Sequence, residues 1–174
     1  MDLAPKDELV GVALATDKDD VVQVTRKGQS IKYSVATLRA ASRTSGGVRG
    51  IRLAEGDSVV SIHRADKDAY LFVVTEKGYG KITPITEYPH QGRAGGGVRT
   101  FKIVDKTGGV TAARVVKLQD QVMLISAEGM VTLTPIKEKD PRFGITTQGR
   151  STQGVRVMTL DESDKLVAIT AFEQ

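Results

Sequence analysis

Three arginines follow the same short motif and are the residues of this chain best suited to binding an anion. They are Arg49, Arg99 and Arg156, and each directly follows a Gly-Val pair. A second arginine lies six residues before each of them, at Arg43, Arg93 and Arg150. Guanidinium groups bind phosphate oxygens with two parallel hydrogen bonds, and glycine-rich loops let backbone amides approach the same oxygens. The repeated spacing therefore predicts a repeated phosphate-binding surface.

Basic residues gather in three windows that contain these motifs. Residues 26–52 hold seven basic residues and no acidic residue, residues 77–103 hold five against one, and residues 129–156 hold five against two. The whole chain carries a formal charge of only +4, so the acidic residues lie mainly elsewhere, in turns such as 17–20 and 161–164. Because the charge recurs with the motif, we expect a basic stripe that binds the phosphate backbone of duplex DNA without reading its bases.

The candidate DNA-binding residues are the basic side chains of these windows. They are Arg26, Lys27, Lys32, Arg39, Arg43, Arg49, Arg52, Lys77, Lys81, Arg93, Arg99, Lys102, Arg142, Arg150 and Arg156. A second interpretation stays open, in which the stripe binds an acidic protein partner or another part of the same enzyme. A generic duplex would displace such a partner only if both used the stripe.

Residue types that support catalysis are scarce. The chain has no cysteine, and His63 and His90 stand without the neighbours that a metal site or a catalytic triad requires. We expect packing or solvated roles for both histidines, and packing roles for Tyr79 and Tyr88. The sequence predicts no catalytic residue, no metal site and no cofactor.

The elements that carry the stripe repeat about every 50 residues. Each repeat contains a strand after an acidic turn, a hairpin around a glycine (Gly28, Gly78 or Gly129) and the Val-Arg strand. Four short strands per period of this length are typical of a propeller blade. We therefore predict an all-β, propeller-like domain over residues 1–174, with three four-stranded blades at about 7–57, 58–108 and 109–163 and a closing or next-blade strand at 164–174.

Three blades form an open arc, because a propeller needs at least about four to close. Two outcomes are expected and the sequence does not choose between them. Either the chain self-associates, or strands at 8–13 and 165–169 pair and close the arc. No run of residues is apolar enough for a membrane span, and a soluble, cytoplasmic protein is expected.

The tandem order of these motifs resembles the C-terminal β-pinwheel domain of DNA gyrase A, a domain that topoisomerase IV shares. Residues 44–60, 77–88 and 149–156 carry the resemblance, which runs from about Asp7 to Ile169 and fits the last three of six blades. It implies a noncatalytic part that wraps DNA in an ATP-dependent type II topoisomerase and biases strand passage toward negative supercoiling. The catalytic tyrosine would lie outside this chain. The implied partners are DNA, the rest of gyrase A, and gyrase B, in the bacterial nucleoid.

The gyrase signature box, Gln-Arg-Arg-Gly-Gly-Lys-Gly, belongs to the first blade of that domain and is absent from this chain. The nearest approach is residues 91–97, which contain one arginine where the box has basic residues at three places.

Overall fold

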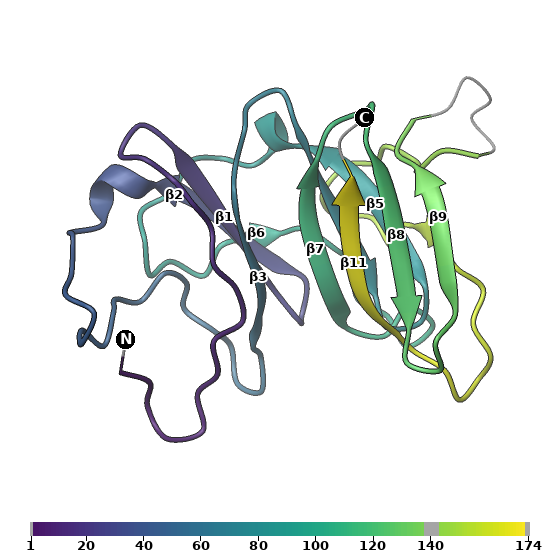
Figure 1. Cartoon of the computed structure of the whole chain (residues 1–174), viewed down its shortest axis with the longest axis horizontal. Coiled ribbons are helices and arrows are strands. Elements are labelled where there is room, and N and C mark those ends of the chain that lie inside the picture. Colours follow the sequence, from purple (N-terminus) through teal and green to yellow (C-terminus); the bar gives the residue numbers. More distant parts are fainter. Residues whose placement is uncertain (1, 138–142, 173–174) are drawn as a thin grey trace.

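The computed structural model describes residues 2–137 and 143–172, which form three antiparallel β-sheets. Along the long axis of the molecule, the sheets follow one another in chain order from the N-terminal to the C-terminal end (Figure 1). The only helices in the described residues are two short 3-10 turns, η1 (Val35–Thr37) and η2 (Ile85–Glu87). None of the described helices is long and apolar enough to cross a membrane. The all-β fold is confirmed.

Each sheet is built around one predicted hairpin. The first has the order β3 (Val59–Arg64), β1 (Asp20–Thr25), β2 (Gln29–Ser34) and β6 (Val98–Arg99). The second has the order β10 (Val155–Arg156), β5 (Tyr79–Pro84), β4 (Tyr70–Thr75) and β7 (Val110–Val116). The third has the order β11 (Leu166–Phe172), β8 (Gln121–Ser126) and β9 (Val131–Pro135).

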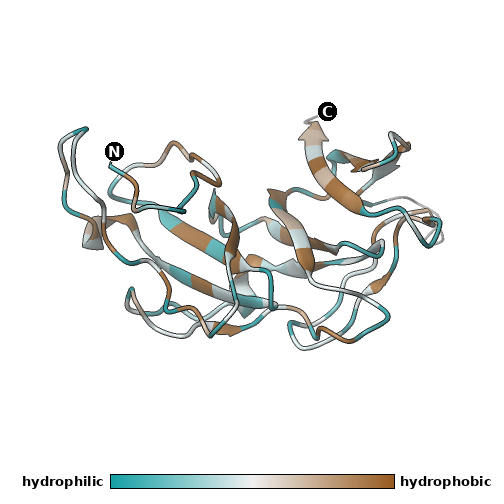
Figure 2. Cartoon of the chain, turned by 90° about the horizontal axis from the view of Figure 1, so that it is seen from below, coloured by the Kyte–Doolittle hydropathy of each residue, from teal (hydrophilic) through white to brown (hydrophobic). Residues whose placement is uncertain are grey.

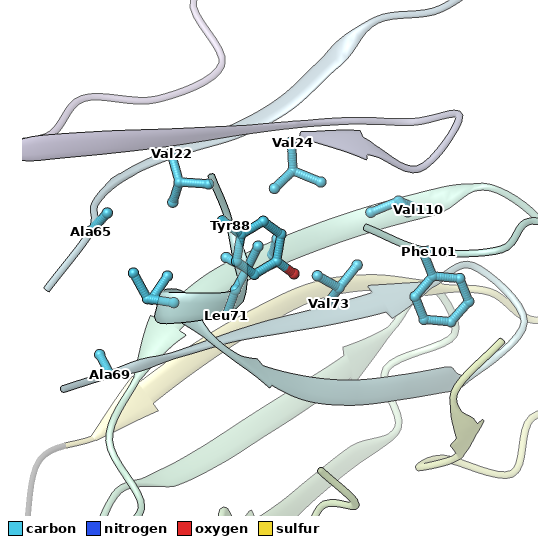
Figure 3. Close-up of a cluster of buried hydrophobic side chains, with 11 residues drawn as sticks. Val22, Val24, Ala65, Ala69, Leu71, Val73, Tyr88, Phe101 and Val110 are labelled. Carbon is cyan, nitrogen blue, oxygen red and sulfur yellow. The ribbon is translucent and has the colours of Figure 1, made fainter. Parts of the chain in front are cut away.

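Apolar side chains on alternate positions of the strands form the cores between the sheets. On β4, Leu71 and Val73 pack toward Val22 and Val24 of the first sheet, as Figure 3 shows. Phe72 and Val74 point to the opposite face of β4 and belong to a second cluster, with Val122, Leu124 and Leu166 of the third sheet. Successive side chains of a strand point to opposite faces, so a strand between two sheets must be apolar on both. Figure 2 shows the result, with hydrophobic residues along the strands and hydrophilic residues mainly in the connections.

The strands of one sheet are not consecutive in the sequence. The hairpin β1–β2 takes β3 on one side and β6 on the other, so the first sheet uses residues from both the 7–57 and 58–108 segments. The second sheet takes β10, which follows the third hairpin, in the same way. Each Val-Arg strand thus pairs with the hairpin of the preceding repeat, a long-range choice that local patterning does not encode.

Two predicted strands are absent from the described residues. Segment 8–13 forms no strand, and neither does the first Val-Arg segment at 48–53. Both would need a hairpin that precedes β1 in sequence, by analogy with β3 and β6. Of the two outcomes left open by the sequence, closure by pairing of 8–13 with 165–169 is not found in this structure, since 8–13 forms no strand and β11 pairs only with β8.

Candidate nucleic-acid interface

The glycine-rich connections of successive repeats lie against one another and carry the predicted arginines. Ala94 N donates to Gly50 O at 2.7 Å, and Arg52 N donates to Gly95 O at 2.8 Å. One repeat further along, Lys102 N donates to Thr152 O at 2.9 Å. The three connections are therefore joined by backbone hydrogen bonds into one row.

Arginine side chains reinforce this row. Arg93 Nη1 donates to the carbonyl oxygen of Arg49 at 3.2 Å, and Arg150 Nη1 makes the equivalent contact with Arg99 at 3.4 Å. Arg93 and Arg150 are half-buried, whereas Arg49, Arg99 and Arg156 are exposed. We call Arg43, Arg49, Arg93, Arg99, Arg150 and Arg156 the arginine row. In each of the two later repeats, one arginine braces the loops and leaves the next one exposed to solvent.

Two glycines allow the Val-Arg strands to lie close to the hairpins. Gly97 has a φ of 74°, and a Cβ there would lie 2.3 Å from the carbonyl oxygen of Ser30. Gly154 has a φ of 67°, and a Cβ would lie 2.7 Å from Gly80 O. A side chain at either position is excluded by both the backbone conformation and the contact. These glycines place Arg99 and Arg156 beside the hairpins.

Arg156 lies on an aromatic ring. Its guanidinium carbon is 5.1 Å from the centre of the Tyr79 ring, and Nη2 lies 3.0 Å from the phenol oxygen. Lys106 Nζ lies 5.8 Å from the same ring centre. Tyr79 therefore holds two cations, by the attraction between a cation and an aromatic ring. Lys106 was not among the predicted residues, because it follows Asp105 in a turn just beyond the basic window. Only the folded structure shows that it lies beside Tyr79.

Lys81 does not belong to the exposed surface, and the prediction for this residue is wrong. Its side chain is fully buried and its ammonium donates to Gly149 O at 2.6 Å, Arg150 O at 2.8 Å and Thr152 Oγ1 at 2.9 Å. Nζ also lies 5.2 Å from the centre of the Phe101 ring. Burial lowers the pKa of Lys81 to about 8, with Glu87 opposing and Arg150 adding to the shift. The amine holds the loop that bears Arg150.

Four other residues predicted to bind DNA make hydrogen bonds or an ion pair with groups of the protein itself. Lys27 and Lys77 donate through Nζ to backbone carbonyls of the acidic turns, at Glu55 and Asp105. Arg26 forms an ion pair of 2.5 Å with Glu76, and half-buried Lys32 donates to Ile85 O at 3.3 Å. Burial lowers the pKa of Lys32. These side chains join neighbouring segments of the fold.

Of the other residues predicted to bind DNA, three are exposed and one lies outside the described residues. Arg39, Arg52 and Lys102 are exposed, and Arg142 lies outside the described residues. The histidines contact protein groups: His63 Nε2 lies 2.7 Å from Ala113 O, and His90 Nε2 lies 3.1 Å from Asp20 Oδ1. Tyr88 is buried, as predicted for a packing residue, with its phenol oxygen 2.6 Å from Thr100 Oγ1.

Comparison with known proteins identifies the family. The model of the DNA gyrase C-terminal domain, a β-propeller, matches residues 19–66, 69–117 and 145–173. The chain belongs to this family. The three matched segments are successive along the chain, and together they contain all six residues of the arginine row. The resemblance inferred from the sequence motifs is thereby confirmed.

Relatives and solved structures agree with this assignment. DNA gyrase A of Dehalogenimonas lykanthroporepellens is 48% identical over 96% of this chain and 20% of its own length. The corresponding protein of Escherichia coli K12 is 36% identical over 96% of this chain and 18% of its own length. The chain thus spans about a fifth of these relatives.

A solved gyrase A C-terminal domain matches 99% of this chain and 57% of its own chain, with a TM-score of 0.87 and 25% identity. The C-terminal domain of topoisomerase IV matches 98% of this chain and 52% of its own, with a TM-score of 0.85 and 22% identity, which shows the shared fold.

Proposed function

We propose that this chain binds duplex DNA along the arginine row, without reading base sequence, and bends the duplex around the row. The observation that carries the proposal is that backbone hydrogen bonds join three equivalent loops side by side, and that each loop bears two residues of the arginine row. Membership of the gyrase family supports DNA as the ligand. A repeated cationic edge suits a ligand whose anionic groups also repeat along one direction.

The division of labour within the row follows from exposure. Arg49, Arg99 and Arg156 are exposed and would contact phosphate oxygens directly. Arg93 and Arg150 each donate one hydrogen bond from Nη1 to a protein carbonyl, which restricts the side chain. The other N–H groups of each guanidinium would then be available to phosphate oxygens. Backbone hydrogen bonds join the loops that bear these charges, so we expect the duplex to follow the row. Bending a duplex costs on the order of several kcal/mol, offset by the additional contacts.

In a complete gyrase A protein, this chain would be a noncatalytic part of the enzyme. Wrapping a duplex beside the cleavage site would present a second segment of the same DNA for passage, in keeping with ATP-dependent negative supercoiling. Gyrase B, the remainder of gyrase A and the catalytic tyrosine would lie outside these residues, and the assembly would act in the cytoplasm on the nucleoid. Family membership supports this proposal.

Salt dependence of DNA binding tests the proposal. The triple variant Arg49→Gln, Arg99→Gln and Arg156→Gln should bind a fluorescent duplex more weakly, and the slope of log K against log salt should become shallower by about 3, since each lost phosphate contact contributes roughly 0.9. The matched control is Lys18→Gln, Lys67→Gln and Lys117→Gln, which removes the same charge from exposed turns outside the row.

An unchanged slope in the arginine variant would overturn the proposed contact surface, as would an equal loss in the lysine control. Absence of duplex binding by the unmodified chain at low salt would overturn DNA binding by these three sheets. That result would favour an acidic protein partner instead.

A further inference from the structure

Lys81 carries a buried charge that the proposed DNA contacts do not use. Its side chain is 0% exposed, on β5, three residues after the hairpin glycine Gly78. Burying an ammonium costs free energy unless hydrogen bonds replace its hydration. The role of Lys81 must therefore lie in the hydrogen bonds that it makes.

The Lys81 ammonium donates to four acceptors in one short loop, residues 149–152. Nζ lies 2.6 Å from Gly149 O, 2.8 Å from Arg150 O, 3.3 Å from Thr152 O and 2.9 Å from Thr152 Oγ1. Carbonyl groups of successive residues can converge on one donor only if the backbone curves around it. The buried amine thus fixes the backbone conformation of this loop.

Arg150 leaves this loop toward the connection before it. Its Nη1 donates to Arg99 O at 3.4 Å, and Lys102 N donates to Thr152 O at 2.9 Å. The direction of the Arg150 side chain depends on the backbone torsion angles of that residue, and its own carbonyl oxygen accepts from Lys81. Lys81 and Arg150 therefore belong to one hydrogen-bond network.

The first sheet holds the equivalent loop with an apolar side chain. Ile31 occupies the position of Lys81 after its own hairpin glycine. Its Cδ1 would lie 3.7 Å from a Cβ built at Gly95, so the isoleucine lies against the backbone of loop 91–97. The two loops are thus held by different chemistry.

The backbone contacts of the two loops differ as well. Loop 91–97 forms two backbone hydrogen bonds with the connection before it, through Ala94 and Gly95. In the described part of the chain, loop 148–154 forms one such bond, through the carbonyl of Thr152. Lys81 therefore adds contacts to a loop that has fewer backbone hydrogen bonds than its counterpart.

We propose that Lys81 is a positioning residue for DNA binding, which acts through Arg150 and does not touch the duplex. The inference rests on the proposed function of the arginine row. By fixing the loop, Lys81 orders the Arg150 side chain before DNA binds. An ordered guanidinium loses less conformational entropy on binding a phosphate than a free one, so the affinity for DNA is higher.

A double-mutant cycle on duplex affinity tests the proposal. Lys81→Met should weaken the binding of a fluorescent duplex to the folded chain several-fold at low salt. In the Arg150→Gln background that loss should be at least about twofold smaller, because residues of one hydrogen-bond network are not additive. The matched control is the Arg93→Gln background, in which the loss should be the same as in the unmodified chain. Removal of one charge, or partial unfolding, would act equally on both backgrounds.

Two results of the cycle would overturn the inference alone. One is an equal loss in the Arg150→Gln and Arg93→Gln backgrounds, and the other is a duplex affinity that Lys81→Met leaves unchanged. Absence of duplex binding by the unmodified chain would instead overturn the proposed function, and with it the role of Lys81.

Trypsin cleavage tests the ordering of the loop without DNA. Lys81→Met should raise the initial rate of cleavage after Arg150 several-fold relative to the rate after Arg93, because proteases cut locally opened chain. Mass spectrometry of the first fragments gives both rates from one sample. Thr152→Val removes one acceptor of Lys81 and should change the ratio in the same direction by less, which keeps the test valid if Lys81→Met does not fold. An unchanged ratio in both variants would contradict the inference.

Discussion

The ammonium of Lys81 donates a hydrogen bond of 2.8 Å to the backbone carbonyl oxygen of Arg150. The two residues carry the same charge and lie close together, yet their roles differ. Lys81 is fully buried and its ammonium donates hydrogen bonds to carbonyls of the loop that contains Gly149 and Arg150. The side chain of Arg150 extends from the same loop and donates to the carbonyl oxygen of Arg99. The buried cation thus shapes the loop that bears part of the arginine row. The equivalent positions of the other hairpins are Ile31 and Thr132, so this anchor belongs to the middle sheet alone.

Replacing Lys81 by methionine should destabilise the fold. The substitution keeps the apolar stem but removes the ammonium that donates to the carbonyl of Arg150, while Gly149 O keeps its hydrogen bond from Thr152 Oγ1. The expected cost is about 1–3 kcal/mol, the range for an unsatisfied buried polar group. Urea unfolding followed by circular dichroism measures the change. The control Lys77→Met removes an exposed amine that contacts one carbonyl, at Asp105, and should cost much less. Equal losses in the two variants would contradict the anchoring role.

The stability of the unmodified chain should rise with pH above about 8, relative to Lys81→Met. The pKa of Lys81 is lowered by burial to about 8 from its ordinary 10.5, so between these values the unfolded chain binds more protons than the folded one. Raising the pH across this window therefore favours the folded state, by up to about 3 kcal/mol. Below pH 8 the difference between the two proteins should be flat. A difference that is flat or declines from pH 8 to 10 would refute the assignment.

Alanine at Gly154 should disrupt the pairing of β10 with β5. The new Cβ would lie 2.7 Å from Gly80 O at a φ of 67°, and the expected loss is about 2 kcal/mol or more. Thermal unfolding gives the comparison with Gly92→Ala, where no heavy atom lies within 4 Å. If Gly92→Ala were as damaging as Gly154→Ala, the close approach of the strand would not be the cause.

Arg26 should contribute little to DNA binding despite its place in a basic window. Its guanidinium is paired with Glu76 across two hairpin turns, and a partly exposed pair of this kind is worth at most about 1 kcal/mol of stability. Arg26→Gln should therefore leave duplex affinity nearly unchanged, whereas Arg99→Gln should weaken it several-fold at low salt. Fluorescence anisotropy with one duplex measures both. A greater loss from Arg26→Gln than from Arg99→Gln would move the candidate interface to the hairpin turns.

Local patterning predicted the strands that pair with their neighbours in sequence. The hairpins at β1–β2, β4–β5 and β8–β9 follow from alternating apolar residues around a turn glycine, and Gly28 has the positive φ of 80° that such a turn needs. The in-phase arginines likewise predicted a row, which the loop hydrogen bonds assemble. These features depend on short segments, whose conformational preferences reside in the residues themselves.

By itself the sequence determined the all-β class, the repeat, the hairpins and the arginine spacing. Only the tertiary structure decided which sheet receives each Val-Arg strand, that Lys81 is buried, and that Lys27, Lys77 and Arg26 are occupied within the protein. The physical reason is that the sequence gives the position of each charged residue along the chain but not the environment of its side chain. Whether a cation meets solvent, a carboxylate or a backbone carbonyl depends on contacts between residues some 30 to 70 positions apart, and those contacts exist only when the sheets have packed.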